Sequence, residues 1–458
     1  MQIISQGNRD LRKLLPAPET RDVRYVPAAF VLRRECGDGT LLCHTMTGEL
    51  ALLTPEETRC LDALPGPAEP GLAGLIAHRF AVPEGSREDR TAEELRALLR
   101  TRRRAAGAIV HYNILPTTHC NARCFYCFES GMRRVHMPEE TADRLADFII
   151  AHAKGKPVML SWFGGEPTLG RERIDRICAR LSERQLPYTS SMVSNGYLFD
   201  EALVRQAVEA WKLRHIQITL DGMEEVYNRT KAYVGVTGSP YRRVLRNIGL
   251  LLAAGVQVDV RLNLDKHNGE DLAGLIRELG ARFRGEKRLT VYVSRLKEDV
   301  GFNPIPHCAE DGEELDERLV SLQRLLEDMG WQQFRSTELP ELRVCSCMAD
   351  DPAVIQCTPE GILSKCEDWI YDRTVGTLEE GVTDRENERW WQERTAWDGC
   401  AECPLYPGCV YLLSHCPVKR GKCLPADRER RIARCRDVML ERYAAWKQSG
   451  EQETEQET

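Results

Sequence analysis

The stretch IVHYNILPTTHCNARCFYC, residues 109–127, decides the fold of this chain and the chemistry it can carry. Its first half is apolar enough for a buried strand, and its second half places three cysteines at Cys120, Cys124 and Cys127. Three thiolates on one tight loop can hold three corners of a cubane iron-sulfur cluster and leave the fourth iron without a protein ligand. Because catalytic metal sites keep an open position and structural sites do not, the stretch predicts a reactive metal centre.

On its own, a cysteine triplet could also be a zinc site or three unrelated thiols. The run from Cys120 to Cys127, with Phe125 and Tyr126 before its last cysteine, resembles the signature loop of the radical S-adenosylmethionine enzymes. The resemblance implies that the open iron binds the amino and carboxylate groups of S-adenosylmethionine. It also implies that one electron from the cluster cleaves this cofactor to a 5'-deoxyadenosyl radical, and that the backbone of Tyr126 meets the adenine.

The composition indicates an intracellular, metal-binding enzyme. The 458 residues, 42% of them hydrophobic, suffice for two or three domains with their own cores. There are 18 cysteines and no signal peptide in residues 1–10, so we expect a cytoplasmic protein whose clustered thiols bind metal. No apolar run approaches the roughly 20 residues of a membrane span. The net charge of -7 argues against a nucleic-acid binder, and the basic groups at 100–104 and 428–436 are interpreted as solvated helix faces.

Residues 108–300 alternate apolar runs with amphipathic stretches, the pattern of repeated strand-helix units around a parallel sheet. Helices are expected from Pro138 to Gly155 and from Ser239, a capping residue, to Gly255. The fold class is therefore α/β, a partial barrel of six strand-helix units smaller than the eight-stranded TIM barrel, with reactive groups at the strands' carboxyl ends. The six predicted strands are Ile109–Leu115, Val158–Phe163, Tyr188–Val193, His215–Leu220, Val256–Leu264 and Leu289–Val293.

Candidate cofactor-binding residues follow these strands. The second strand is followed by Gly164, Gly165, Glu166 and Pro167. This sequence resembles the family motif that binds the amino group of S-adenosylmethionine. Two glycines let the backbone approach a ligand closely, and a carboxylate can pair with an ammonium group. The other candidates are Ser194 and Asn195, Thr219 and Asp221, Arg229 with Lys231 as its alternative, and Arg261 and Asn263. Asn195 and Asp221 could instead shape turns, and Arg261 and Asn263 could belong to a buried structural network.

A second group of cysteines lies in the last quarter of the chain. The spacing of Cys347, Gly361, Cys366, Cys400, Cys403, Cys409, Cys416 and Cys435 resembles the SPASM domain, which holds two auxiliary four-iron clusters. By position, the resemblance assigns Cys400, Cys403, Cys409 and Cys435 to one cluster. It assigns Cys347, Cys366 and Cys416 to the other, with Cys345 as eighth ligand. The gap of six residues after Cys409 departs from the usual three, and Cys357 or Cys423 could replace Cys345.

Not every thiol is expected to bind metal. A zinc ribbon at Cys400 and Cys403 would leave the upstream loop unexplained. The remaining cysteines are interpreted as ordinary small residues of the core or surface; they are Cys36, Cys43, Cys60, Cys178 and Cys308.

Glu367, directly after Cys366, is the candidate catalytic residue. In the anaerobic sulfatase-maturating enzymes, which share this architecture, the residue after the equivalent cysteine is an Asp that acts as base. The resemblance therefore suggests that Glu367 takes a proton from the substrate or orients it beside an auxiliary cluster. A solvent-facing loop carboxylate is the alternative.

Residues 1–105 predict a small α+β, winged-helix-like module. Val26–Arg33 and Leu41–Leu53 are expected strands, Thr54 to Glu57 has a capping-box pattern, and helix is expected around Glu93–Arg103. The arrangement resembles the leader-recognition elements of enzymes that modify ribosomally made peptides, which accept a leader as an added strand. The further predicted domains are the barrel at 106–300, a helical linker at 301–340, the SPASM domain at 341–442 and a disordered acidic tail at 443–458.

The sequence thus predicts a radical S-adenosylmethionine oxidoreductase that modifies a precursor peptide with a leader and a Cys-containing core, by a thioether or other carbon crosslink. Its cofactors would be S-adenosylmethionine and three 4Fe-4S clusters, with an external electron donor such as flavodoxin or ferredoxin. An anaerobic sulfatase-maturating enzyme, which forms formylglycine, and an iron-sulfur electron carrier are the alternatives.

Overall fold

The computed structural model describes residues 1–15, 23–296, 312–331, 338–416, 423 and 425–456. The chain forms two compact units. The barrel unit comprises residues 106–335 and 348–392, and the terminal unit comprises residues 1–105, 336–347 and 393–458. The sequence instead predicted one domain over 341–442. Parts of the predicted linker, residues 301–311 and 332–337, lie outside the described residues.

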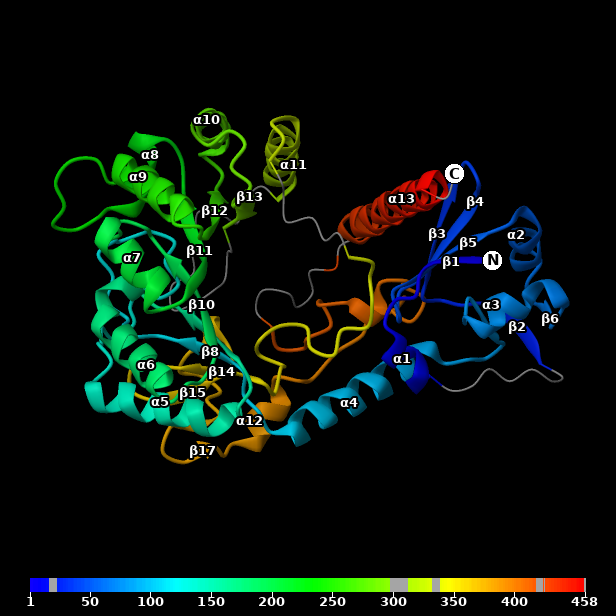
Figure 1. Cartoon of the computed structure of the whole chain (residues 1–458), viewed down its shortest axis with the longest axis horizontal. Coiled ribbons are helices and arrows are strands. Elements are labelled where there is room, and N and C mark those ends of the chain that lie inside the picture. The colour runs from blue at the N-terminus through cyan, green and yellow to red at the C-terminus, as the bar shows by residue number, and fades with distance from the viewer. Residues whose placement is uncertain (16–22, 297–311, 332–337, 417–422, 424, 457–458) are drawn as a thin grey trace. The chain divides into compact units, whose positions relative to one another are not determined.

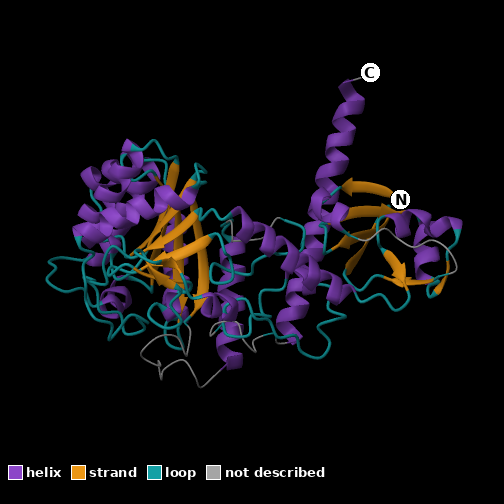
Figure 2. Ribbon diagram, turned by 90° about the horizontal axis from the view of Figure 1, so that it is seen from below, coloured by secondary structure: helices purple, strands orange, loops and turns teal. Residues whose placement is uncertain are grey.

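The barrel unit is built on parallel strands in the order β13-β12-β11-β10-β9-β8. All six strands predicted from the sequence are present, which confirms the partial barrel. Figure 2 shows this sheet curving, with helices on its outer side. The strands are β8 (His111–Ile114), β9 (Val158–Trp162), β10 (Tyr188–Ser194), β11 (Leu213–Leu220), β12 (Gln257–Leu264) and β13 (Leu289–Arg295).

The helices between the strands begin and end at the residues that their sequences indicate. Ser239 caps α9, where its hydroxyl accepts a hydrogen bond from the Arg242 amide, and the two helices predicted at 138–155 and 239–255 are both present. Their apolar faces pack on the sheet in one large core. The helices are α5 (Glu139–Ala153), α6 (Arg171–Glu183), α7 (Glu201–Glu209), α8 (Glu224–Lys231), α9 (Pro240–Ala253), α10 (Gly269–Arg282) and α11 (Gly312–Asp328), with a 3-10 turn, η2, at Pro167–Gly170 (Figure 1).

A later segment of the chain extends the same sheet. The strand β14 (Val354–Cys357) pairs in parallel with β8, and an antiparallel meander continues from it. This segment carries Cys366 and Glu367 to the edge of the barrel sheet. The strands of the meander are β15 (Ile362–Ser364), β16 (Gly376–Thr377) and β17 (Gly381–Val382). The 3-10 turn η3 (Glu367–Trp369) lies between β15 and β16, and α12 (Arg385–Trp390) follows β17.

The terminal unit contains two small antiparallel sheets, in the orders β1-β5-β4-β3 and β6-β2-β7. The helix predicted after Thr54 is present as α2, with its capping box formed, and the helix predicted around Glu93 is present as α4. The elements are β1 (Gln2–Ser5), α1 (Arg9–Leu14), β2 (Arg24–Pro27), β3 (Val31–Cys36), β4 (Gly39–His44), β5 (Glu49–Leu53), α2 (Pro55–Asp62), β6 (Gly66–Pro67), η1 (Pro70–Leu72), α3 (Ala73–Ala77), β7 (Ala81–Pro83), α4 (Glu88–Ala106), η4 (Tyr406–Gly408) and α13 (Pro425–Gln456).

Two strands expected in this unit are each divided in the structure. The predicted strand Val26–Arg33 is β2 and β3 in different sheets, because Tyr25 and Phe30 are buried in different hydrophobic clusters. The predicted strand Leu41–Leu53 is the hairpin of β4 and β5, where Gly48 adopts a φ of 71° in the turn. Both stretches contain a turn signal that the predictions passed over: Pro27 in the first, and the polar segment with Gly48 in the second.

The prediction of a disordered tail over 443–458 is wrong for residues 443–456, because α13 continues to Gln456. Tyr443 is buried against β3 and β4 residues and donates a hydrogen bond to Asp38. Lys447 binds the same carboxylate at 2.8 Å. These contacts give the helix an anchor beyond the point where the apolar content of the sequence falls.

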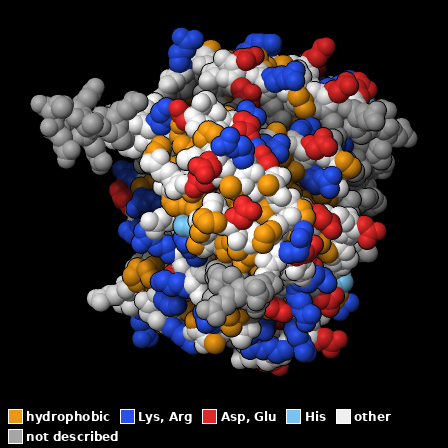
Figure 3. Space-filling view, turned by 90° about the vertical axis from the view of Figure 1, so that its right-hand side faces the viewer, with side chains coloured by type: hydrophobic (Ala, Val, Ile, Leu, Met, Phe, Trp, Pro, Cys, Tyr) orange, Lys and Arg blue, Asp and Glu red, His pale blue; other side chains and the backbone are white. Residues whose placement is uncertain are grey.

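The sequence also led us to expect a surface that is not a general nucleic-acid binder and a chain without a membrane-spanning segment. Figure 3 shows one face of the molecule, on which acidic and basic side chains are interspersed with hydrophobic ones. Within the described residues, no helix combines the length and the apolar character needed to cross a membrane.

Candidate functional site

The carboxyl ends of the barrel strands surround a pocket of about 310 Å³. Because β8 to β13 run in parallel, the loops that follow them meet at one end of the sheet, as in other barrel enzymes. The pocket is lined by the cysteine loop, by strand-end residues and by residues that follow β15. Its lining includes Cys120, Cys124, Tyr126, Cys127, Phe128, Glu129, Phe163, Gly164, Gly165, Ser194, Asn195, Gln217, Thr219, Lys231, Arg261, Asn263, Leu296, Glu367 and Asp368.

The cysteine loop is held in place by its own backbone and by neighbouring loops. The Ala122 amide donates to the Cys120 sulfur at 3.4 Å, and the Asn195 side chain donates to Asn121 at 2.7 Å. The Arg123 amide donates to the Lys231 carbonyl at 2.8 Å. An amide aimed at a sulfur favours the thiolate, so the loop suits sulfur ligation.

Each of the three thiols has a different charged neighbour. Burial, with a contribution from the charge of Glu166, raises the pKa of Cys120 to about 12. Burial raises the pKa of Cys127 to about 11, with a contribution from Glu129. Burial also raises the pKa of Cys124, which the charge of Lys231 opposes. Without a metal these thiols would be protonated at neutral pH, so binding iron must release their protons.

The described residues contain no set of three Cys, His, Asp or Glu side chains that converge on a single metal ion. A mononuclear zinc site needs such convergence. In a four-iron cluster each thiolate binds its own iron, so the sulfurs stand apart around the cluster. The three thiols around one pocket therefore suit a cluster better than a single ion.

The two glycines after β9 are required by the protein backbone. A β-carbon on Gly164 would lie 2.4 Å from the Thr117 carbonyl oxygen, and one on Gly165 would lie 2.3 Å from that of His119. The Gly165 and Glu166 amides donate to these carbonyls at 3.2 and 2.8 Å. The turn thus packs directly on the segment that leads into Cys120, and its glycines position the cysteine loop as well as lining the pocket.

Glu166 is fully buried behind the pocket wall. Its carboxylate accepts hydrogen bonds from the Ser194 hydroxyl at 2.9 Å, the Asn195 amide at 2.8 Å and the Thr168 hydroxyl at 2.5 Å. Burial raises its pKa, and these hydrogen bonds lower it. Glu166 therefore ties the end of β10 to the glycine turn, while Pro167 begins η2 and is buried.

Tyr126 belongs to a buried network around Asp221. The Tyr126 hydroxyl donates to the Asp221 carboxylate at 2.9 Å, and the Lys231 ammonium group lies 3.0 Å from the same carboxylate. The Asn263 side chain donates to it at 3.1 Å, and Asn268 donates to the Asp221 carbonyl at 3.0 Å. Burial lowers the pKa of Lys231, but the charges of Asp221, Tyr126 and Cys124 together outweigh this effect and hold the pKa well above its ordinary value. The network fixes Tyr126 from the ends of β11 and β12.

The predicted cofactor residues divide into those that line the pocket and those that do not. Tyr126, Gly164, Gly165, Ser194, Asn195, Thr219, Arg261 and Asn263 line it, whereas Glu166, Pro167 and Asp221 lie behind them. Arg229 lies outside the lining; its side chain is 68% exposed and 3.6 Å from Glu225. Lys231, the alternative to Arg229, lines the pocket. Arg261 donates to Asn263 at 2.9 Å and to Ser294 at 3.1 Å.

Glu367 also lines the pocket, together with Asp368 and Glu129. Burial, together with the charge of Glu367, raises the pKa of Glu129 to about 8. The predicted catalytic carboxylate is partly buried and is one of three acidic side chains that line the pocket.

The remaining candidate thiols separate into different environments. Cys357 is buried in the barrel core, and its thiol lies 3.4 Å from the Thr358 carbonyl. Burial raises its pKa, so it is a poor ligand candidate. Cys366 belongs to the barrel unit, whereas Cys345, Cys347 and Cys416 belong to the terminal unit.

Within the terminal unit, Cys423 and Cys435 have different neighbours. Burial raises the pKa of Cys423, and so do the charges of Cys409 and Cys400. Burial also raises the pKa of Cys403, with contributions from Cys409 and Cys423. Cys435 lies on α13, in the cluster with Leu32, Leu41 and Cys43, and its charge raises the pKa of Cys43. The charges of Cys400 and Cys409 thus act on Cys423, whereas Cys435 packs against the same hydrophobic cluster as Cys403, with Cys43 in its core.

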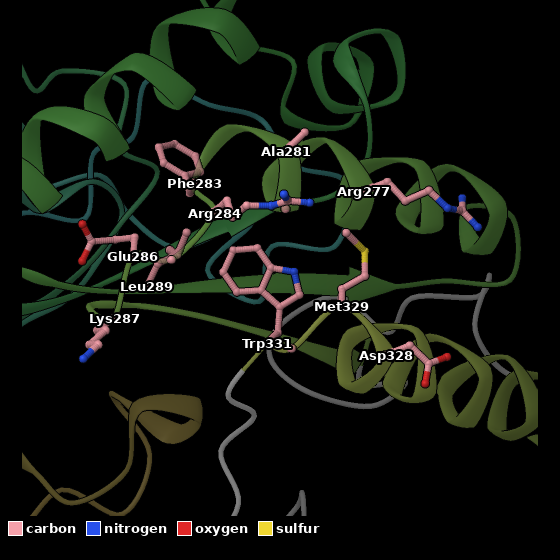
Figure 4. A pocket seen from close by; sticks show the side chains of 13 residues that line it. Arg277, Ala281, Phe283, Arg284, Glu286, Lys287, Leu289, Asp328, Met329 and Trp331 are labelled. Carbon is pink, nitrogen blue, oxygen red and sulfur yellow. The ribbon is translucent and has the colours of Figure 1, made fainter.

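A larger cavity of about 610 Å³ lies at the other end of the barrel, where Leu289 begins β13. Figure 4 shows Trp331 and Met329 projecting between α10 and β13. Its charged residues are Arg277, Arg284, Glu286, Lys287 and Asp328, and no cysteine lines it. The cavity at the carboxyl ends of the strands is the better candidate for the functional site because it contains the three thiols.

The pocket residues that were not singled out from the sequence include Gln217, Phe128 and Glu129. Gln217 lies two residues before Thr219 on β11, and the alternation of side chains along a strand could have indicated that both face the same way. Phe128 and Glu129 directly follow Cys127, but nothing in the spacing shows that they turn into the pocket.

Comparison with known families and structures agrees with this geometry. Residues 114–279 match the model of the Radical SAM superfamily. No curated protein sequence matches the chain.

Several solved structures share the fold at low sequence identity. Native anSMEcpe with bound AdoMet and a Cp18Cys peptide has a TM-score of 0.54 and 15% identity, over 75% of this chain and 99% of that one. Streptococcus suis SuiB bound to the precursor peptide SuiA has a TM-score of 0.51 and 13% identity, over 87% of this chain and 99% of that one. The likeness therefore extends beyond the barrel.

Proposed function

Since residues 114–279 form a radical SAM domain, we propose that this chain is a radical S-adenosylmethionine enzyme that modifies a ribosomally made precursor peptide. The modification would be a thioether or another crosslink to carbon. The observation that carries the proposal is the single pocket that contains three thiols, the strand-end polar groups and Glu367.

The residues around the pocket fit a cluster and a nucleotide cofactor. Cys120, Cys124 and Cys127 would hold a 4Fe-4S cluster, and an amide already points at one of the sulfurs. When bound, the cluster and S-adenosylmethionine would supply a 5'-deoxyadenosyl radical that removes a hydrogen atom from a substrate carbon. The chain's own contribution is to orient the reactants and to exclude water.

The polar residues at the strand ends would bind the cofactor. The backbone of Tyr126 would meet the adenine, and Ser194, Asn195 and Thr219 would bind hydroxyl and carboxylate groups. The cations Lys231 and Arg261 suit the cofactor's carboxylate, since each lines the pocket. Glu166 and Asp221 would act from behind the wall by fixing these side chains.

Glu367 would act on the peptide substrate. A carboxylate in the pocket can take the proton from a cysteine thiol, or hold that thiol in place, while the carbon loses a hydrogen atom. The product would be lighter by two hydrogens, and an auxiliary cluster would accept the surplus electron.

Two auxiliary 4Fe-4S clusters belong to the proposal. For one of them we propose Cys400, Cys403, Cys409 and Cys423, so that Cys423 takes the role that spacing suggested for Cys435. The charges of Cys409 and Cys400, which raise the pKa of Cys423, support this choice. Cys435, which packs against the same hydrophobic cluster as Cys403, is the alternative fourth ligand. The other set, Cys345, Cys347, Cys366 and Cys416, rests on the sequence pattern. An external flavodoxin or ferredoxin would supply electrons in the cytoplasm, and the module at residues 1–105 would bind the leader.

The experiment uses the full chain reconstituted anaerobically with iron and sulfide. With S-adenosylmethionine and dithionite it should release 5'-deoxyadenosine, and a Cys-containing precursor peptide encoded beside its gene should lose two hydrogens by mass spectrometry. Glu367→Gln should abolish peptide product and retain 5'-deoxyadenosine formation. Full product formation by this variant would remove Glu367 from the mechanism.

The same experiment separates the alternatives. A sulfatase-maturating enzyme would convert a Cys or Ser of a sulfatase peptide to formylglycine; Glu367 in the place of Asp and the additional N-terminal module count against it. An iron-sulfur electron carrier would release no 5'-deoxyadenosine, and the polar groups around the pocket count against it.

A further inference from the structure

The charged residues of the pocket are separated by sign. The cations Lys231 and Arg261 are both held by side chains of the barrel, Lys231 by Asp221 and Arg261 by Asn263 and Ser294. The carboxylates Glu129, Glu367 and Asp368, which we call the acidic side, line the same pocket.

Glu129 lacks a partner for one of its oxygens. Its Oε1 atom is buried and has no hydrogen-bond partner within the described residues. A buried carboxylate oxygen without a donor costs free energy, and the carboxylates of Glu367 and Asp368, which line the same pocket, add the cost of gathering like charges. A ligand group that brings both N–H donors and positive charge would remove both penalties.

The walls of the pocket beside Glu129 are apolar. The rings of Phe128 and Phe163 are stacked with centroids 6.0 Å apart, and both line the pocket, as does Leu296. Aromatic and aliphatic surfaces next to carboxylates suit a side chain with a long apolar stem and a cationic head. A hydrated divalent cation would gain nothing from such walls, because it prefers oxygen ligands on every side.

We propose that the acidic side binds a Lys or Arg side chain of the substrate peptide, with the cationic head at Glu129 and Glu367 and the stem against Phe128 and Phe163. The inference rests on the proposed function, since it takes the substrate to be a peptide, and it names a residue that the modified region of that peptide must contain. Lys and Arg share the chemistry that the pocket recognises, and the test distinguishes them.

The test measures binding to the full chain reconstituted with iron and S-adenosylmethionine and requires no reaction. The probes are Nα-acetyl-lysine methylamide, Nα-acetyl-arginine methylamide and the uncharged Nα-acetyl-norleucine methylamide, observed by ligand-detected NMR. One or both cationic probes should bind about tenfold or more tightly than the norleucine probe, as expected for a charge-assisted hydrogen bond. The tighter of the two identifies the preferred residue.

The variants assign the preference to the acidic side. Glu129→Gln should abolish the preference for the cationic probes and leave the affinity for S-adenosylmethionine unchanged. Asp372→Asn is the matched control, because Asp372 is an exposed acid close to Glu367 in the sequence and does not line the pocket; it should keep the preference. If Glu129→Gln fails to fold, Glu367→Gln takes its place.

Equal affinity for the lysine, arginine and norleucine probes would overturn the inference. A preference that survives in both Glu129→Gln and Glu367→Gln would also overturn it, as would weaker S-adenosylmethionine binding by folded Glu129→Gln, which would assign Glu129 to the cofactor. The outcome is separate from that of the proposed function. The peptide could lose two hydrogens while the three probes bind equally, which would overturn only this inference. The probes could also show the preference even if no peptide is modified, which would overturn only the proposed function.

Discussion

The barrel unit and the terminal unit both carry cysteines, but they position them by different means. In the barrel unit, Cys120 follows a strand, and its loop is held by hydrogen bonds to Asn195 and Lys231 from later strand-helix units. In the terminal unit, Cys400, Cys403 and Cys409 lie in a loop packed against a hydrophobic cluster. The barrel strands thus position the cysteines of the first site, whereas loop packing positions those of the second. Cysteine spacing therefore predicts the ligands of the second site less well.

The sharpest test of this difference compares one cysteine from each unit. Cys124→Ala should abolish 5'-deoxyadenosine formation and remove about four irons per chain. Cys403→Ala should remove a similar amount of iron but retain 5'-deoxyadenosine formation, because its thiol does not line the barrel pocket. Iron analysis measures the metal content of each variant, and chromatography measures the 5'-deoxyadenosine that it forms. Loss of 5'-deoxyadenosine in Cys403→Ala would show that the two sites are not independent.

A second comparison tests loop packing against cysteine spacing within the terminal unit. Cys423→Ala should lower the iron content by about four per chain, since it would remove the fourth ligand of a cluster. Cys435→Ala should leave the iron content unchanged, because a four-iron cluster that Cys423 completes has no place for a further thiolate. Iron and sulfide analysis of the anaerobically reconstituted chains decides between them. The opposite result would restore the assignment that spacing suggests.

The barrel network should contribute strongly to stability. Asp221→Asn should lower the free energy of unfolding by about 3–5 kcal/mol, because it leaves the buried Lys231 ammonium without its counter-charge. The double variant Asp221→Asn with Lys231→Met should recover most of the loss, since no charge is then buried alone. Urea unfolding measures both. A loss as small as that of a surface pair would contradict the role given to the network.

The matching ion pair of the terminal unit should contribute little. Asp38 and Lys447 lie 2.8 Å apart, but their side chains are 50% and 44% exposed. Water and salt screen such a pair, so Asp38→Asn should leave the urea midpoint within experimental error. A clear shift would show that the end of α13 depends on this contact more than on the packing of Tyr443.

Much of the barrel could be predicted from the sequence because its signals are local. Each of the six strands is an apolar run that ends in small polar residues, and Ser239 caps a helix through the amide of Arg242. The same locality explains the errors in the terminal unit. Apolar residues on both sides of Pro27 and of Gly48 outweighed these turn residues, so β2 and β3, and β4 and β5, were each predicted as one strand.

The candidate site was predictable where chemistry follows a strand end, as at Thr219 and Asn263. It was less predictable where the chain turns back. Arg229 and Lys231 lie two residues apart near the end of α8, and only the helix geometry exposes Arg229 and buries Lys231 against Asp221. The glycines at 164 and 165 were recognised, but their role against the carbonyls of Thr117 and His119 was not.

The sequence by itself determined the cysteine triplet, the alternation of strands and helices, and the polar residues at the strand ends, since each depends on neighbours a few positions away. Only the tertiary structure decided which residues meet. It brought Glu129 to Glu367 across more than two hundred residues, and Cys423 to Cys409 across a gap of unusual length. The physical reason is that charge and burial depend on distance in space, which spacing along the chain fixes only within one helix, strand or turn.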